Sequence, residues 1–61
     1  MSKKDAVQAA VNAVATATTV INSYGKNSRE AASALQAARD AVTTARRLGA
    51  TDNDLRNARP Q

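Results

Sequence analysis

The sequence of 61 residues contains neither cysteine nor histidine. Without cysteine no disulfide can form, and without both residues the usual zinc ligands and thiol or imidazole catalysis are excluded. The five aspartate and glutamate residues are scattered along the chain, and none stands at a spacing typical of acid–base or metal chemistry. We therefore expect no enzyme activity, no metal and no cofactor.

Large apolar side chains are also scarce, since Tyr24 is the single aromatic residue and alanine supplies most of the apolar positions. Aromatic side chains bury much area, whereas each alanine buries little. A domain of about 60 residues buries only roughly 60% of its unfolded surface, and small scaffolds usually need additional stabilisation. We expect one small helical domain over residues 1–61 that forms a homodimer or a higher homo-oligomer.

No long apolar run is present. The most apolar stretch, AAVNAVATATTVI at residues 9–21, is interrupted by asparagine and threonine, unlike a membrane span or a signal-peptide core. We expect a cytoplasmic protein with no membrane partner and no small-molecule substrate.

Capping signals divide the chain into three helices. A serine, threonine or asparagine followed three residues later by an acidic residue is typical of a helix start, and glycine is typical of a helix end. The start signals are Ser2 with Asp5, Asn27 or Ser28 with Glu30 close behind, and Thr51 with Asp54, and the stop signals are Gly25, Gly49 and Pro60. The predicted helices cover about residues 3–24, 28–48 and 51–58.

The threonine- and valine-rich part of residues 15–21 also suits a strand, but its apolar residues recur at helical spacing. Apolar positions repeat in steps of three and four along both long segments, at 6, 10, 13, 17, 20 and 24 and at 31, 34, 38, 41, 45 and 48, and alanine fills nearly all of them. Such rows let two helices approach closely. The predicted fold class is therefore all-α: an antiparallel hairpin with a short third helix, which oligomerises into a helical bundle.

Larger apolar residues lie beside these alanine rows. We interpret them as a self-association face, made of Val7, Val14, Ile21, Leu35, Val42 and Leu55. Two arrangements fit this pattern: a dimeric four-helix bundle, or a hairpin whose third helix covers one end with Leu55.

The stretch ARRLGATDNDLRNA, residues 45–58, resembles the first helix and turn of bacterial helix-turn-helix domains. The resemblance implies a recognition helix after the turn, but the chain reaches Pro60 and Gln61 first, so that only the short segment 51–58 is left to serve as one. We therefore interpret Gly49 as the end of the second helix and Thr51 as the cap of the third.

Nine lysine and arginine residues give a net charge of +4, which favours anionic partners. The arginines that we expect to contact a partner are Arg39, Arg46, Arg47, Arg56 and Arg59. Tyr24 has two interpretations, either as a plug at the end of the alanine core or as a binding anchor for a partner.

Two functions fit these features. The uncharged helix faces favour a small protein-interaction or assembly protein that self-associates and binds a larger protein, such as an accessory or inhibitor protein of the phage or plasmid type. The excess of arginine favours the alternative, a small basic dimeric regulator that contacts nucleic-acid phosphates at the junction of the second and third helices.

Overall fold

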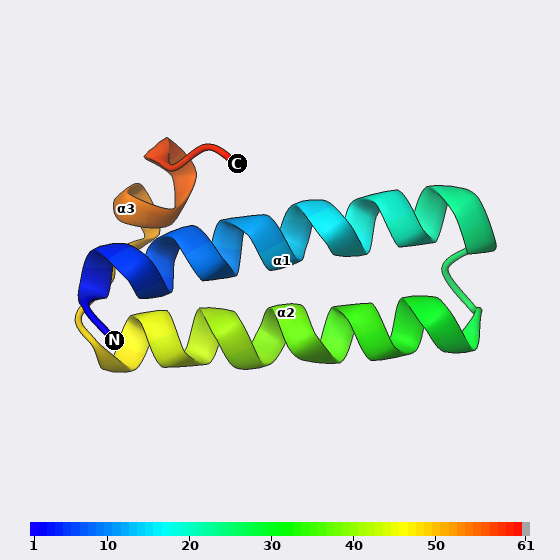
Figure 1. The fold of residues 1–61 in the computed structure, drawn as a ribbon, viewed down its shortest axis with the longest axis horizontal. Helices are drawn as coiled ribbons and strands as arrows, with labels where there is room; N and C mark the ends of the chain where they lie inside the picture. The colour runs from blue at the N-terminus through cyan, green and yellow to red at the C-terminus, as the bar shows by residue number, and fades with distance from the viewer. Residues whose placement is uncertain (61) are drawn as a thin grey trace.

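Two long antiparallel helices form most of the molecule, and a short third helix lies against one end (Figure 1). The computed structural model describes residues 1–60, with helices α1 at Lys3–Tyr24, α2 at Arg29–Arg47 and α3 at Asp52–Asn57 and with no strand in that range. Helix α3 packs against α1, so that both ends of the described chain lie in the same half of the hairpin. The predicted all-α class and helical hairpin are confirmed.

Hydroxyl side chains begin all three helices. The Ser2 hydroxyl accepts a hydrogen bond from the backbone N–H of Asp5 at 3.2 Å, and the Ser28 hydroxyl accepts one from Ala31 at 3.0 Å. Thr51 and Asp54 form a reciprocal capping box, with bonds of 3.1 and 3.0 Å. Each cap satisfies N–H groups that have no partner within the helix.

Helix α1 has the predicted bounds. The bounds of α2 and α3 differ from the predicted ones by one residue at each end, because their capping residues lie outside the helix. The second cap is Ser28 rather than Asn27, and α2 therefore starts at Arg29. Helix α2 ends at Arg47 and α3 at Asn57, with Leu48 and Ala58 as their C-caps.

Both glycines end a helix with a backbone that other residues rarely adopt. Gly25 has φ of 90° and Gly49 has φ of 98°, in the positive region that costs glycine little. The N–H of Gly25 donates to the carbonyl of Ile21 at 2.8 Å, and that of Gly49 donates to Arg46 at 3.0 Å. The interpretation of Gly49 as a helix end and of Thr51 as a cap is confirmed.

Threonines inside the helices bond to the preceding turn. The hydroxyls of Thr18, Thr19 and Thr44 donate to the carbonyls four residues earlier, at 3.0 to 3.2 Å. Such local bonds satisfy the hydroxyl within helical geometry, and the threonine-rich stretch at residues 15–21 is a helix, as its apolar spacing predicts, and not a strand.

Alanine forms nearly all of the core between α1 and α2. The buried residues are Ala6, Val7, Ala10, Ala17, Ala31, Ala38 and Ala45. Within this set, Ala10 and Ala17 are seven residues apart, as are Ala31, Ala38 and Ala45. This spacing is the heptad repeat of paired helices, and it confirms that the alanine rows form the contact within the hairpin.

The expected ends of these rows are not buried. Tyr24 is 62% exposed and Leu48 is 42% exposed. Each directly precedes the glycine at which its helix ends. The interpretation of Tyr24 as a plug at the end of the core is therefore wrong.

Candidate protein-interaction surface

Two adjoining hollows form a groove on one face of the hairpin. The first has a volume of about 350 Å³ and is lined by Ala10, Val11, Val14, Ala15, Val42, Leu55, Arg56 and Pro60. The second has a volume of about 510 Å³ and is lined by Val14, Leu35, Ala38, Arg39, Val42, Thr43 and Arg46. Since Val14 and Val42 line both hollows, we treat them as one feature, the apolar groove.

The groove follows from the order of residues on each helix. Val14 comes four residues after buried Ala10, and Val42 comes four residues after buried Ala38. Four residues along a helix is a rotation of about 40° beyond one full turn. Because the helices are antiparallel, a rotation of the same sense on each one moves both side chains to the same face of the hairpin.

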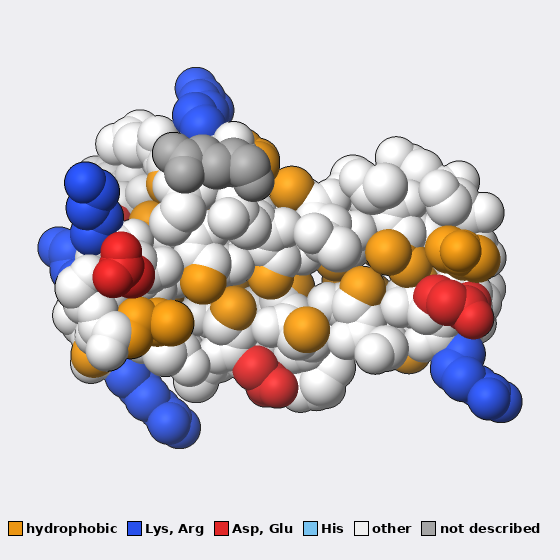
Figure 2. Space-filling model, viewed as in Figure 1, with side chains coloured by type: hydrophobic (Ala, Val, Ile, Leu, Met, Phe, Trp, Pro, Cys, Tyr) orange, Lys and Arg blue, Asp and Glu red, His pale blue; other side chains and the backbone are white. Residues whose placement is uncertain are grey.

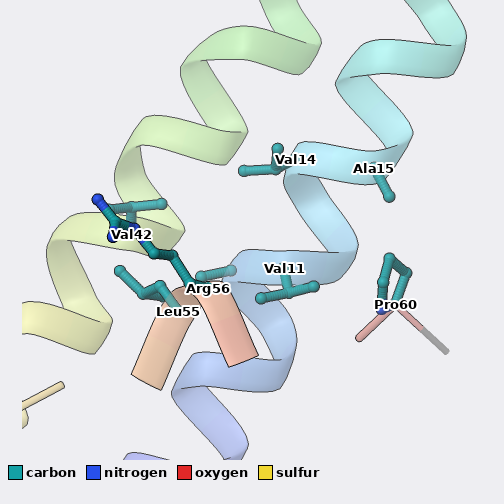
Figure 3. Close-up of a pocket in the computed structure, with 8 residues that line it drawn as sticks. Val11, Val14, Ala15, Val42, Leu55, Arg56 and Pro60 are labelled. Atoms are coloured by element: carbon teal, nitrogen blue, oxygen red, sulfur yellow. The ribbon is translucent and has the colours of Figure 1, made fainter. Parts of the chain in front are cut away.

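Side chains from all three helices meet in the groove (Figure 3). Val42 of α2 and Leu55 of α3 lie on one side, and Val11 and Val14 of α1 lie on the other. Val14 is 48% exposed. A branched apolar side chain left half in water in this way is available for burial against another surface.

The surface of α1 around the groove carries no charge. Residues 6–25 contain no lysine, arginine, aspartate or glutamate. Figure 2 shows apolar side chains along the line between the two long helices, with uncharged surface over the C-terminal half of α1. Helix surfaces that face only water are usually rich in charge, so this surface suits contact with other protein.

Arginines border the groove on the sides of α2 and α3. Arg39 and Arg46 line the second hollow, and Arg56 lines the first. Arg47 and Arg59 line neither hollow. The five predicted arginines are thus distributed around the groove and the end of the hairpin and do not line a common hollow.

One of these arginines already has an acidic partner. The guanidinium of Arg46 lies 3.1 Å from the carboxylate of Asp52 in α3, and both side chains are largely exposed. Such surface pairs contribute little to stability. The pairing nevertheless lowers the positive charge available where α2 meets α3.

Asp54 joins α3 to the beginning of α1. Its carboxylate accepts the backbone N–H of Thr51 and lies 3.3 Å from the ammonium of Lys3. The backbone hydrogen bond, followed by the hydrogen bond and charge of Lys3, lowers the pKa of Asp54 below its usual value of 3.8, because each favours the ionised form.

The predicted self-association residues fall into two groups. Val14 is exposed, and Leu35, Val42 and Leu55 are half-buried in the groove lining. Ile21 is half-buried and lines neither hollow.

Val7 departs from the prediction, since only 8% of it is exposed. It lies in the core cluster against which Leu55 of α3 packs. Val7 therefore has little surface left to offer a partner, while Tyr24, the predicted anchor, is exposed but lies outside both hollows.

The segment after α3 contributes residues that sequence reasoning missed. The side-chain amide of Gln8 donates to the carbonyl of Arg59 at 2.7 Å and to Asn12 at 3.0 Å. This bond holds Pro60 beside α1, where it lines the first hollow. No sequence signal pairs Gln8 with a carbonyl so far along the chain.

Over residues 1–60, no group of three or more acidic side chains is arranged to hold a metal ion. In the same range no helix combines the length and the apolar character needed to cross a membrane. Comparison with protein-family models, with curated proteins and with solved structures gives no match to this chain.

Proposed function

We propose that this chain is a small protein-interaction and assembly protein that works by packing its apolar groove against another polypeptide. The observation that carries the proposal is the continuous groove of branched apolar side chains beside the uncharged surface of α1. Covering such a surface removes apolar area from water, which favours association by about 25 cal/mol per Å².

The composition of the core supports the same function. Six of the seven buried residues are alanine, and the seventh is Val7. The longer side chains Leu35, Val42 and Leu55 are only half-buried. Much of the apolar side-chain surface that would stabilise an isolated domain is thus left for burial against a partner.

The test is capture with matched variants. Immobilised wild-type chain, a Val14→Asp variant and an Ala9→Asp variant are each mixed with lysate and with a differently tagged copy of the chain. Ala9 is exposed and lies on the same helix outside the groove. We expect polypeptides that bind the wild type and Ala9→Asp but not Val14→Asp. Identical captured sets for all three chains would contradict the proposal.

The basic character of the chain supports a second proposal, contact with nucleic-acid phosphates through arginines near α2 and α3. Arg39, Arg47 and Arg56 are exposed and the net charge is +4, which suits salt-sensitive phosphate binding. The test is the mobility of DNA and RNA duplexes with wild type and with an Arg46→Ala, Arg47→Ala variant, at low and moderate salt. Absence of binding at low salt would refute it.

A further inference from the structure

Helix α3 covers one half of the apolar face of the hairpin and leaves the other half open. Val7, Val14 and Ile21 follow one another at seven-residue intervals on α1, as Leu35 and Val42 do on α2. Near α3 the first of them, Val7, is only 8% exposed, whereas Val14, two turns further along, is 48% exposed. The cluster that contains Val7 is covered by residues in and beside α3, namely Ala50, Leu55 and Ala58, as well as by residues of the two long helices.

Helix α3 is too short to bury the apolar side chains along the whole length of the hairpin. Helix α3 has six residues, which corresponds to about 9 Å, whereas the molecule is 32 Å long. Two apolar rows side by side on a helix require two neighbouring helices. The alanine row of each long helix packs against the other long helix. The row of larger apolar residues has α3 as a neighbour near Val7, and within residues 1–60 no helix packs on the part around Val14.

The chain exposes more surface than a compact monomer of the same mass. The chain exposes 4406 Å² for a mass of 6.4 kDa, whereas a compact monomer of that mass exposes about 3,800 Å². The excess is roughly 600 Å² per chain over the whole elongated surface, and a contact that buried that much of each of two chains would bury roughly 1,200 Å² in total. That area reaches the lower end of the range for specific protein–protein interfaces.

The distribution of charge on the chain is compatible with a second copy that packs on the open part of the apolar face. Two copies with a net charge of +4 each repel one another. Residues 6–25, which make up most of α1, nevertheless bring no charge to the contact. At the border of the groove Arg46 is paired with Asp52 at 3.1 Å. Contact through Val14 and the uncharged surface of α1 therefore adds no charge from that helix, while Arg39 and Arg56, which also line the hollows, lie at the border of the contact.

We propose that a second copy of this chain covers the open half of the face, with Val14, Leu35 and Val42 of each copy at the centre of a two-fold symmetric contact. In such a contact the same patch of both copies meets itself, and the two hairpins form a four-helix assembly. This inference rests on the proposed function, since it names the partner of the same surface.

Sedimentation equilibrium of the purified full chain tests the pairing from micromolar to millimolar concentration. The wild type and Ala9→Asp are expected to reach twice the mass of 6.4 kDa. Val14→Asp is expected to raise the dissociation constant by about 30-fold or more, the loss typical of a central interface residue. Far-ultraviolet circular dichroism confirms that each variant is helical, and Val14→Thr provides a milder change if Val14→Asp does not fold.

Two results would overturn the pairing: a wild-type chain that stays monomeric over the whole range, or an assembly that Val14→Asp and Ala9→Asp weaken equally. The proposed function has a separate outcome. A monomeric chain that still captures another polypeptide through Val14 would overturn the second copy as partner and leave the interaction function standing. A chain without either property would overturn both.

Discussion

Replacing Ala31 by leucine tests whether the two long helices depend on the close approach that alanine allows. Ala31 is fully buried in the first turn of α2. The short connection at residues 25–28 holds the end of α1 nearby. Ala32, the next residue, is exposed, so Ala32→Leu makes the same chemical change on the same helix without entering the contact.

The expected magnitude follows from how much room the contact leaves. Leucine adds three carbon atoms beyond the β-carbon, and if they found space the gain would be roughly 2.4 kcal/mol. Helices in contact through alanine lie at or below the 8 Å end of the usual interaxial range, so we expect overpacking, which costs about 1–3 kcal/mol. A domain of this length has a total stability of about 3–9 kcal/mol, so the loss is a large part of it.

Thermal unfolding followed by circular dichroism at one fixed protein concentration measures the effect. Each kcal/mol corresponds to about 4–8 °C in Tm for a small domain, so Ala31→Leu is expected to lower Tm by about 4–24 °C. The surface change Ala32→Leu is expected to stay within about 4 °C of wild type. A Tm for Ala31→Leu equal to or above that of wild type would refute the tight alanine contact.

Three smaller perturbations test local features. Ser28→Ala removes the cap of α2 and should cost about 1 kcal/mol in urea unfolding, whereas Asn27→Ala in the adjacent loop should cost less than half of that. Because the pKa of Asp54 is lowered in the folded chain, its contribution to stability is present above the unfolded pKa of about 3.9 and is lost as pH falls through the lower folded value. Stability measured from pH 6 to pH 2 should therefore decline less steeply for Asp54→Asn than for wild type, and equal slopes would contradict this origin. Gln8→Ala removes the bond to the Arg59 carbonyl and should increase the mobility of residues 58–60 in NMR relaxation, with unchanged helix content.

Local sequence signals predicted the secondary structure well because they act over one helical turn. A serine or threonine hydroxyl reaches an N–H group three residues away, and glycine accepts positive φ wherever it occurs. The one misplaced signal was Asn27 with Glu30: Ser28 is closer to the first turn of α2 and bonds Ala31 instead. Such competition between neighbouring caps depends on the path of the loop.

The alanine rows were also predictable, since a seven-residue repeat of small residues defines one side of a helix whatever it packs against. Their ends were not, and Tyr24 shows the reason. Periodicity assigns it to the buried side, but burial also needs a neighbouring side chain in contact, and Tyr24, the last residue of α1, is 62% exposed.

The sequence by itself determined the three helices, their caps and the side of each long helix that is small and apolar, because these depend on neighbours a few residues apart. Only the tertiary structure decided which apolar residues remain accessible. Val7 and Val14 belong to the same row in the sequence, yet the first lies in the core cluster on which Ala50, Leu55 and Ala58 pack, and the second is 48% exposed. The same docking placed Pro60 against α1 and paired Arg46 with Asp52, since these contacts depend on where a distant segment comes to rest.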